Sequence, residues 1–95
     1  MAKAKLVEDL QLDEYQDRFK EHFMMKRENG ILEIRMHTQG GEAKWGKELH
    51  RALPQIFQIA GADRQNEVII LTATGDYWLR EFDHESWGEI ETNEA

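Results

Sequence analysis

The chain has 95 residues and a formal net charge of −7, from 12 Lys and Arg against 19 Asp and Glu. This length allows one small domain, because domains usually contain roughly 100–150 residues. Six acids and no Lys or Arg lie in residues 81–95, so the rest of the chain is almost neutral, with 13 acids against 12 bases. This distribution argues against a nucleic-acid surface and against a polybasic membrane anchor.

The chain contains no cysteine, which excludes disulfides, a thiolate nucleophile and Cys-ligated zinc. Its four histidines do not have the spacing of metal ligands: His22, His37, His50 and His84. No segment approaches the roughly 18 consecutive apolar residues of a membrane span, and the N-terminus lacks the apolar part of a signal peptide. We therefore expect a cytoplasmic protein with no metal or other cofactor and no nucleic-acid or membrane partner.

Residues 1–11 mix lysine, alanine and acids without a clean period and are expected to be a loosely ordered lead-in. The next segment, residues 12–23, is predicted to be a helix. Asp13 followed by Gln16 has the form of a capping box. The apolar residues of this segment have helical spacing: Leu12, Tyr15, Phe19 and Phe23.

Two antiparallel strands are predicted next. Asn29-Gly30 lies between FMMKR and ILEIRMHT, and this dipeptide favours a type I′ hairpin turn, which needs positive φ at both central residues. The second strand alternates apolar with polar residues, so we expect one buried face and one polar face. The apolar set is Leu32, Ile34 and Met36, and the polar set is Glu33, Arg35 and His37.

A second helix is predicted from Trp45 to Ala60, with Gly61 as its C-terminal cap. Its apolar residues follow helical spacing: Trp45, Leu49, Ala52, Leu53, Ile56, Phe57 and Ala60. Pro54 lies inside this run and removes the amide that would bond to the carbonyl of His50, at a cost of roughly 3 kcal/mol in a regular helix. A kink or a break is therefore expected.

The run VIILTAT, residues 68–74, is apolar and rich in β-branched residues, which is typical of a parallel interior strand buried on both faces. Residues 31–74 then read as strand, helix and strand, a βαβ crossover. The predicted fold class is α/β or α+β, with a helix, a β-hairpin, a kinked helix and a buried strand in one domain. Residues 84–95 are expected to be an acidic tail.

Three stretches of the sequence, NGILEIRMHT, WGKELHRALPQIF and DRQNEVIILTATGDYWLREFD, carry a family resemblance. They resemble the N-terminal part of the crotonase (enoyl-CoA hydratase/isomerase) superfamily, and within it the β-diketone hydrolases of the 6-oxocamphor hydrolase type. The resemblance implies that residues 12–83 form the first turn of the ββα spiral of this family. It also implies a truncated chain, because family members are more than twice as long.

The resemblance also implies a set of site residues. TATGDYW, residues 72–78, resembles a strand end that the family follows with a turn whose backbone amide donates to an enolate. Here that turn is residues 79–83 and the amide is that of Phe82, although Arg80-Glu81 replaces the small residue pair usual in the family. Trp45 matches a position where the diketone hydrolases place an aromatic residue against the substrate. Together with Trp45, Glu81 and Trp87 are the candidate ligand-binding residues.

The leading interpretation is a truncated, non-catalytic crotonase-like module that forms a homo-oligomer, most simply a dimer, and binds a protein partner or a small apolar or acyl ligand. By the resemblance, the second oxyanion donor and the acid and base residues of the family lie outside this chain. The alternative is a hydrolase or hydratase acting on a β-diketone or acyl-CoA, with a site completed across subunits and acids such as Glu81, Asp83 or Glu85. A third interpretation is a fragment or decayed gene product. Trp45 also fits a core position, and Phe82 also fits an inherited turn without a present role.

Overall fold

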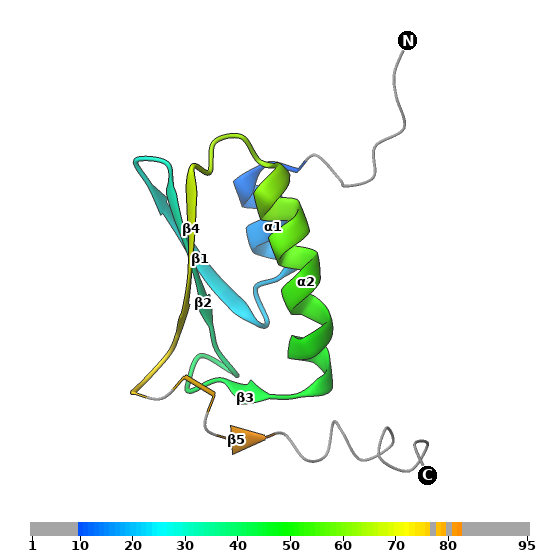
Figure 1. The fold of residues 1–95 in the computed structure, drawn as a ribbon. Helices are drawn as coiled ribbons and strands as arrows, with labels where there is room; N and C mark the ends of the chain where they lie inside the picture. The colour runs from blue at the N-terminus through cyan, green and yellow to red at the C-terminus, as the bar shows by residue number, and fades with distance from the viewer. Residues whose placement is uncertain (1–9, 77, 80, 83–95) are drawn as a thin grey trace.

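The computed structural model describes residues 10–76, 78, 79, 81 and 82. Two helices, α1 (Leu12–Arg18) and α2 (Lys47–Ala62), cover one face of a three-stranded sheet (Figure 1). The sheet has the strand order β1-β2-β4, and its strands are Phe23–Glu28, Ile31–Met36 and Val68–Ala73. Among the described residues, a second sheet consists of β3 (Lys44–Trp45) and β5 (Glu81–Phe82). The predicted α+β class is confirmed.

The β1–β2 hairpin forms at the predicted turn. Asn29 and Gly30 have φ angles of 52° and 78°, and Glu28 pairs with Ile31 directly beside them. Both central residues therefore have the positive φ that a type I′ turn requires.

The β4 strand runs parallel to β2, and α2 connects the two, so the predicted βαβ unit is confirmed. The prediction that β4 is an interior strand buried on both faces is wrong. It lies at an edge of the sheet, and Val68 and Ile70 on its outer face are 51% and 45% exposed. A continuous apolar run shows that both faces of a strand are apolar, but whether a neighbour covers them depends on tertiary structure.

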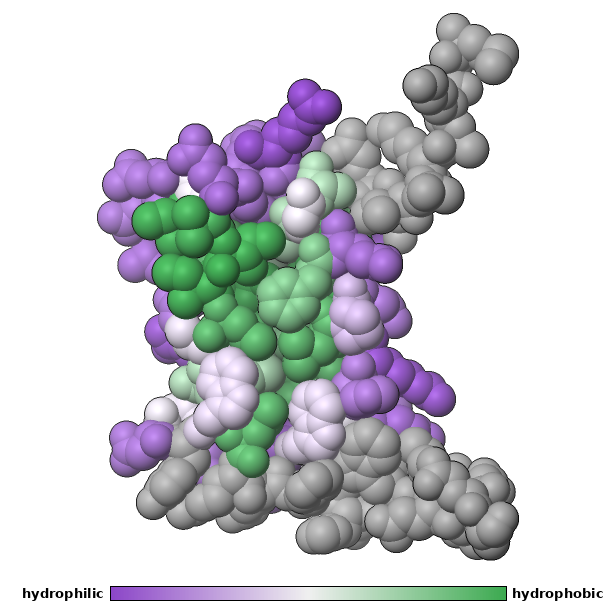
Figure 2. Space-filling view, viewed as in Figure 1, coloured by the Kyte–Doolittle hydropathy of each residue, from purple (hydrophilic) through white to green (hydrophobic). Residues whose placement is uncertain are grey.

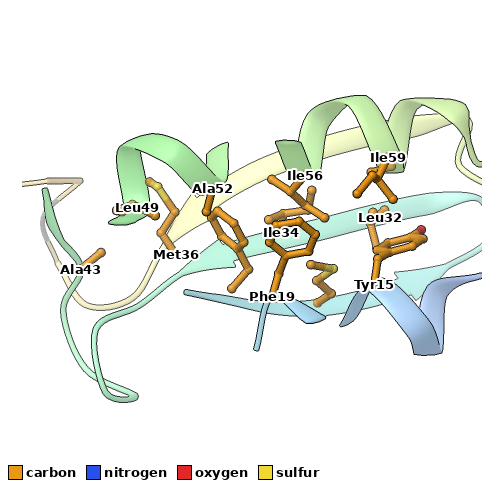
Figure 3. Close-up of a cluster of buried hydrophobic side chains, with 13 residues drawn as sticks. Tyr15, Phe19, Leu32, Ile34, Met36, Ala43, Leu49, Ala52, Ile56 and Ile59 are labelled. Atoms are coloured by element: carbon orange, nitrogen blue, oxygen red, sulfur yellow. The ribbon is translucent and has the colours of Figure 1, made fainter. Parts of the chain in front are cut away.

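The hydrophobic core lies between the inner face of the sheet and the two helices (Figure 3). Leu32, Ile34 and Met36 are fully buried, as the alternation in β2 predicted. The helices cover them with a set of buried apolar residues: Tyr15, Leu49, Ala52, Ile56 and Ile59. Each large side chain in this cluster contributes roughly 1.5–3 kcal/mol by its burial.

The first helix is shorter than predicted. It ends at Arg18, the chain turns, and Phe23 already begins β1. Its N-cap is Gln11, whose backbone N–H donates to Glu14 Oε1 at 3.0 Å. The capping box is therefore formed by Gln11 and Glu14, and the prediction that Asp13 and Gln16 form it is wrong.

The second helix begins at Lys47, after Trp45, and continues unbroken through Pro54. The expected break at Pro54 is therefore absent, since the buried apolar stripe on both sides of the proline holds the helix to the core. Gly61 lies inside the helix and the C-cap is Asp63, so the predicted cap is also wrong.

A buried polar cluster joins α1, β1 and the end of α2. Asp63 Oδ2 accepts from the Tyr15 hydroxyl at 2.7 Å and from Arg27 Nη1 at 2.8 Å. Asn66 Nδ2 donates to the Tyr15 hydroxyl oxygen at 3.0 Å and to the Ala60 carbonyl at 2.9 Å. Every member has a partner, so this cluster fixes the two helices to the hairpin.

Candidate ligand site at the β3–β5 strand pair

The site begins where β4 ends. The amide and the hydroxyl of Thr74 both donate to the Met36 carbonyl at 3.0 Å, which ties the end of β4 to β2. Gly75, with φ of 89°, then redirects the chain. The chain returns as β5 beside β3, at the end of the molecule that is lowest in Figure 1.

The two short strands pair in parallel, with Lys44 opposite Glu81 and Trp45 opposite Phe82. The family turn expected at residues 79–83 is therefore partly a strand, because Glu81 and Phe82 form β5. This pairing places the backbone of Phe82 beside Trp45, two candidate residues that are distant in the sequence. The backbone of Glu81 lies one position earlier in the same pair.

Trp45 was expected in the apolar stripe of α2, but it belongs to β3 and is half-buried. The His50 ring, from the first turn of α2, lies edge-on to the Trp45 ring, with 5.4 Å between centroids and 87° between planes. The His50 amide donates to the Gly46 carbonyl at 2.9 Å, which holds the short connection between the two rings in a helical turn.

Sequence reasoning missed His50 as a site residue. It takes its place beside Trp45 only because the chain changes from strand to helix at Gly46. A helix that started at Trp45 would have placed the two residues on different faces, and no local periodicity marks the change.

The β3–β5 pair has chemistry suited to a small carbonyl compound. Trp45 presents a flat aromatic surface, and the His50 imidazole can donate or accept a hydrogen bond. A backbone amide such as that of Phe82 is the kind of donor that stabilises a carbonyl oxygen or oxyanion. The arrangement can orient a flat ring that carries a ketone.

A hollow of about 480 Å³ lies next to β3, and Lys44, Gly46 and His37 are among its lining residues. Trp45 is not among them, which agrees with the opposite directions of successive side chains in a strand. His37 was expected on the polar face of β2, but it is buried. Its Nε2 donates to the Lys20 carbonyl at 2.8 Å and its Nδ1 accepts from the Gly40 amide at 2.9 Å, so both ring nitrogens hold the loop.

Three of the sequence candidates have no described position. Trp87, Asp83 and Glu85 lie outside the described residues. The described part of the chain holds no cluster of three potential metal-ligating side chains. Neither of its helices is long and apolar enough to cross a membrane.

Comparison with known proteins found a solved structure that is similar to this chain in fold and in sequence. The structure of a β-diketone hydrolase from the cyanobacterium Anabaena sp. PCC 7120, bound to (S)-3-oxocyclohexyl acetic acid, matches this chain with a TM-score of 0.76 and 40% sequence identity. The match covers 85% of this chain and 32% of the hydrolase chain, so this chain spans about a third of the length of that protein. No protein-family model and no curated protein matches the sequence. The fold and the sequence agree over the same residues, so this chain is similar to about a third of a crotonase-superfamily β-diketone hydrolase.

Proposed function

We propose that the chain is a crotonase-like module that binds a small cyclic ketone or diketone at the β3–β5 pair and does not hydrolyse it alone. The observation that carries this proposal is the pairing of Trp45 with Phe82, with the His50 ring 5.4 Å from that of Trp45. The related hydrolase was solved with a cyclic keto acid, which supports a ligand of this chemical class. A small molecule fits these rings better than a protein partner does, because two rings and a short strand offer little contact area.

The affinity is expected to be low. The described residues contact a ligand from one side, whereas small-molecule sites usually enclose most of the ligand surface. We expect a dissociation constant of about 0.1–1 mM, which corresponds to about 4–5.5 kcal/mol.

Hydrolysis demands more than the described residues offer near Trp45. Water must add to one carbonyl and lose a proton to a base, and the carbon–carbon bond must break to leave an enolate that takes up a proton. Both oxygens that gain negative charge need aimed donors. The His50 imidazole provides one group that can transfer a proton. The backbone of β5 provides hydrogen-bond donors from one strand.

A calorimetric titration with two matched ligands tests binding. We expect (S)-3-oxocyclohexyl acetic acid to bind about 3–10-fold more tightly than cyclohexylacetic acid, because only the first offers a ketone to a hydrogen-bond donor. Trp45→Ala should weaken binding at least about tenfold through the lost aromatic contact, while Trp78→Ala, the matched exposed tryptophan, should not. Equal affinity for both ligands, or unchanged binding by Trp45→Ala, would refute the proposed site.

The alternative function is an enzyme whose site is completed by a second subunit. The position of Glu81 in β5, beside Phe82, favours it. Proton NMR of a cyclic β-diketone, and separately of an acyl-CoA, incubated with the chain distinguishes the two. No new product from either compound supports the binding module, whereas turnover that Glu81→Gln abolishes supports the enzyme.

A further inference from the structure

Among the described strands, β4 has an unusual free edge. Among the described strands, β4 pairs only with β2, so its other edge has no strand beside it. Its six residues, VIILTA, include no charged residue and no proline. Proteins usually protect exposed sheet edges with charges, prolines or bulges, because an unprotected edge pairs with other strands.

Apolar side chains border this edge on both faces of the sheet. Val68 and Ile70 are exposed on the outer face, while Ile69 and Leu71 are half-buried on the inner face. Elsewhere, on α2, Phe57 is 38% exposed, although the sequence placed it in the buried stripe. Figure 2 shows the result as a hydrophobic band running down this side of the molecule. The described residues therefore leave apolar side chains exposed along β4.

We propose that two copies of the chain associate through β4, in antiparallel pairing, to form one continuous six-stranded sheet. A two-fold axis perpendicular to the sheet keeps the helices of both copies on the same side. Such an axis places a residue opposite its own counterpart. We assign Ile70 to this position, because Ile69 then pairs with Leu71 of the second copy and the centre of the ladder is entirely apolar.

Charge favours a second copy as the occupant. The segment before β4 carries Arg64 and the segment after it carries Asp76, and both are exposed. Antiparallel pairing brings the Arg64 end of one copy to the Asp76 end of the other. Glu67 does not interfere, because its Oε2 would lie 2.8 Å from a Cβ built on Gly30, which is on the β2 side of the strand.

The size of this surface predicts a weak dimer. The 16 residues of α2 are about 24 Å long, and the helix and sheet layers together are about 20 Å deep, so each copy covers about 480 Å². The total of about 960 Å² is below the range of about 1,200–2,000 Å² for stable complexes. We therefore expect a dissociation constant of tens of micromolar and a dimer fraction that rises with concentration.

Sedimentation equilibrium of the full chain between about 1 and 500 μM tests the dimer over the range that this affinity predicts. Ile70→Lys should give a folded monomer at every concentration, because the side chain is already 45% exposed but two lysines would meet at the axis. Met24→Lys, a 42% exposed residue on the outer face of β1, is the matched control and should dimerise normally. An equimolar mixture of Ile70→Lys and Ile70→Glu should regain the dimer, since opposite charges then meet.

Three results would overturn the proposal. A wild-type chain that stays monomeric at 500 μM would show that something other than a second copy covers the edge, and an Ile70→Lys variant that dimerises normally would place the interface elsewhere. Equal loss of dimer in the Met24→Lys control would show non-specific association. Circular dichroism checks that each variant is folded.

Cysteine cross-linking tests the register independently, because the chain has no native cysteine. Opposite Cα atoms in antiparallel strands are about 4.5–5.5 Å apart, within the range of a disulfide. Ile70→Cys should therefore form a covalent dimer on oxidation, while Met24→Cys should not. The interface uses no residue of the proposed ketone site, so either proposal can fail alone.

Discussion

At the scale of single residues, the polar cluster around Asp63 is the feature that the sequence concealed most completely. Tyr15 was predicted correctly as part of an apolar stripe, yet its hydroxyl donates to Asp63, which lies 48 positions later. No local sequence pattern around Tyr15 or Asp63 predicts that the two residues are in contact. Such long-range polar pairs are visible only once the helices have packed, because a buried carboxylate must find partners to remain charged.

The cluster makes stability depend on pH in two directions. Burial acts to raise the pKa of Asp63, but hydrogen bonds from Tyr15, the Gln65 amide and Arg27 outweigh it and lower the pKa from 3.8. The stabilisation is thus present above pH 3.8 and is lost as the pH falls through the lowered pKa. Burial raises the pKa of Tyr15 above 10.0, so its contribution is present below pH 10 and is lost at higher pH.

Asp63→Asn should destabilise the protein by about 3 kcal/mol at pH 7, because it leaves the partly buried Arg27, whose side chain is 17% exposed, without its ionic partner. Urea unfolding at pH 7, 5 and 3 measures this, and the difference from the wild type should shrink toward pH 3. Asp17→Asn, which removes the exposed pair with Lys20, is the control and should cost less than about 1 kcal/mol. A pH-independent difference would show that the Asp63 charge does not stabilise the fold.

At the scale of elements, the sequence predicted correctly those helices, strands and turns that are determined by neighbouring residues. Asn29-Gly30 specifies its turn through backbone conformation, and the alternation in β2 specifies the buried face. The sequence misplaced Trp45, because β3 exists only where β5 returns to pair with it. The end of α1 was misplaced for a related reason, since Phe23 pairs with Met36 in the hairpin and so leaves the helical pattern.

Two glycine substitutions test how backbone conformation affects the stability of the turn and of α2. Gly30→Ala should cost about 1–2 kcal/mol, because φ of 78° disfavours a side chain and the new Cβ would meet Glu67. Gly61→Ala, inside α2 with no atom within 4 Å of the new Cβ, should stabilise by about 0.5–1 kcal/mol. Thermal unfolding of both variants is the measurement, and equal effects of the same sign would contradict the assigned turn and helix.

At the scale of the whole molecule, the sequence predicted the βαβ unit but not which surfaces stay open. VIILTAT has the composition of a covered strand, yet the described residues place nothing against its free edge. Coverage is a property of the assembly, so composition alone could not reveal it. The candidate site shows the same limit, since Trp45 and Phe82 were both anticipated as site residues but their pairing and the contact with His50 were not.

The central claim is that the β3–β5 pair binds a cyclic ketone. A two-dimensional NMR titration of the ¹⁵N-labelled chain with (S)-3-oxocyclohexyl acetic acid tests it most directly. The amide signals of Phe82 and Trp45 and the indole N–H signal of Trp45 should shift together and approach saturation by about 10 mM ligand, while the Ile70 amide stays in place. Shifts confined to the hollow near His37, or no shift at that concentration, would contradict the claim.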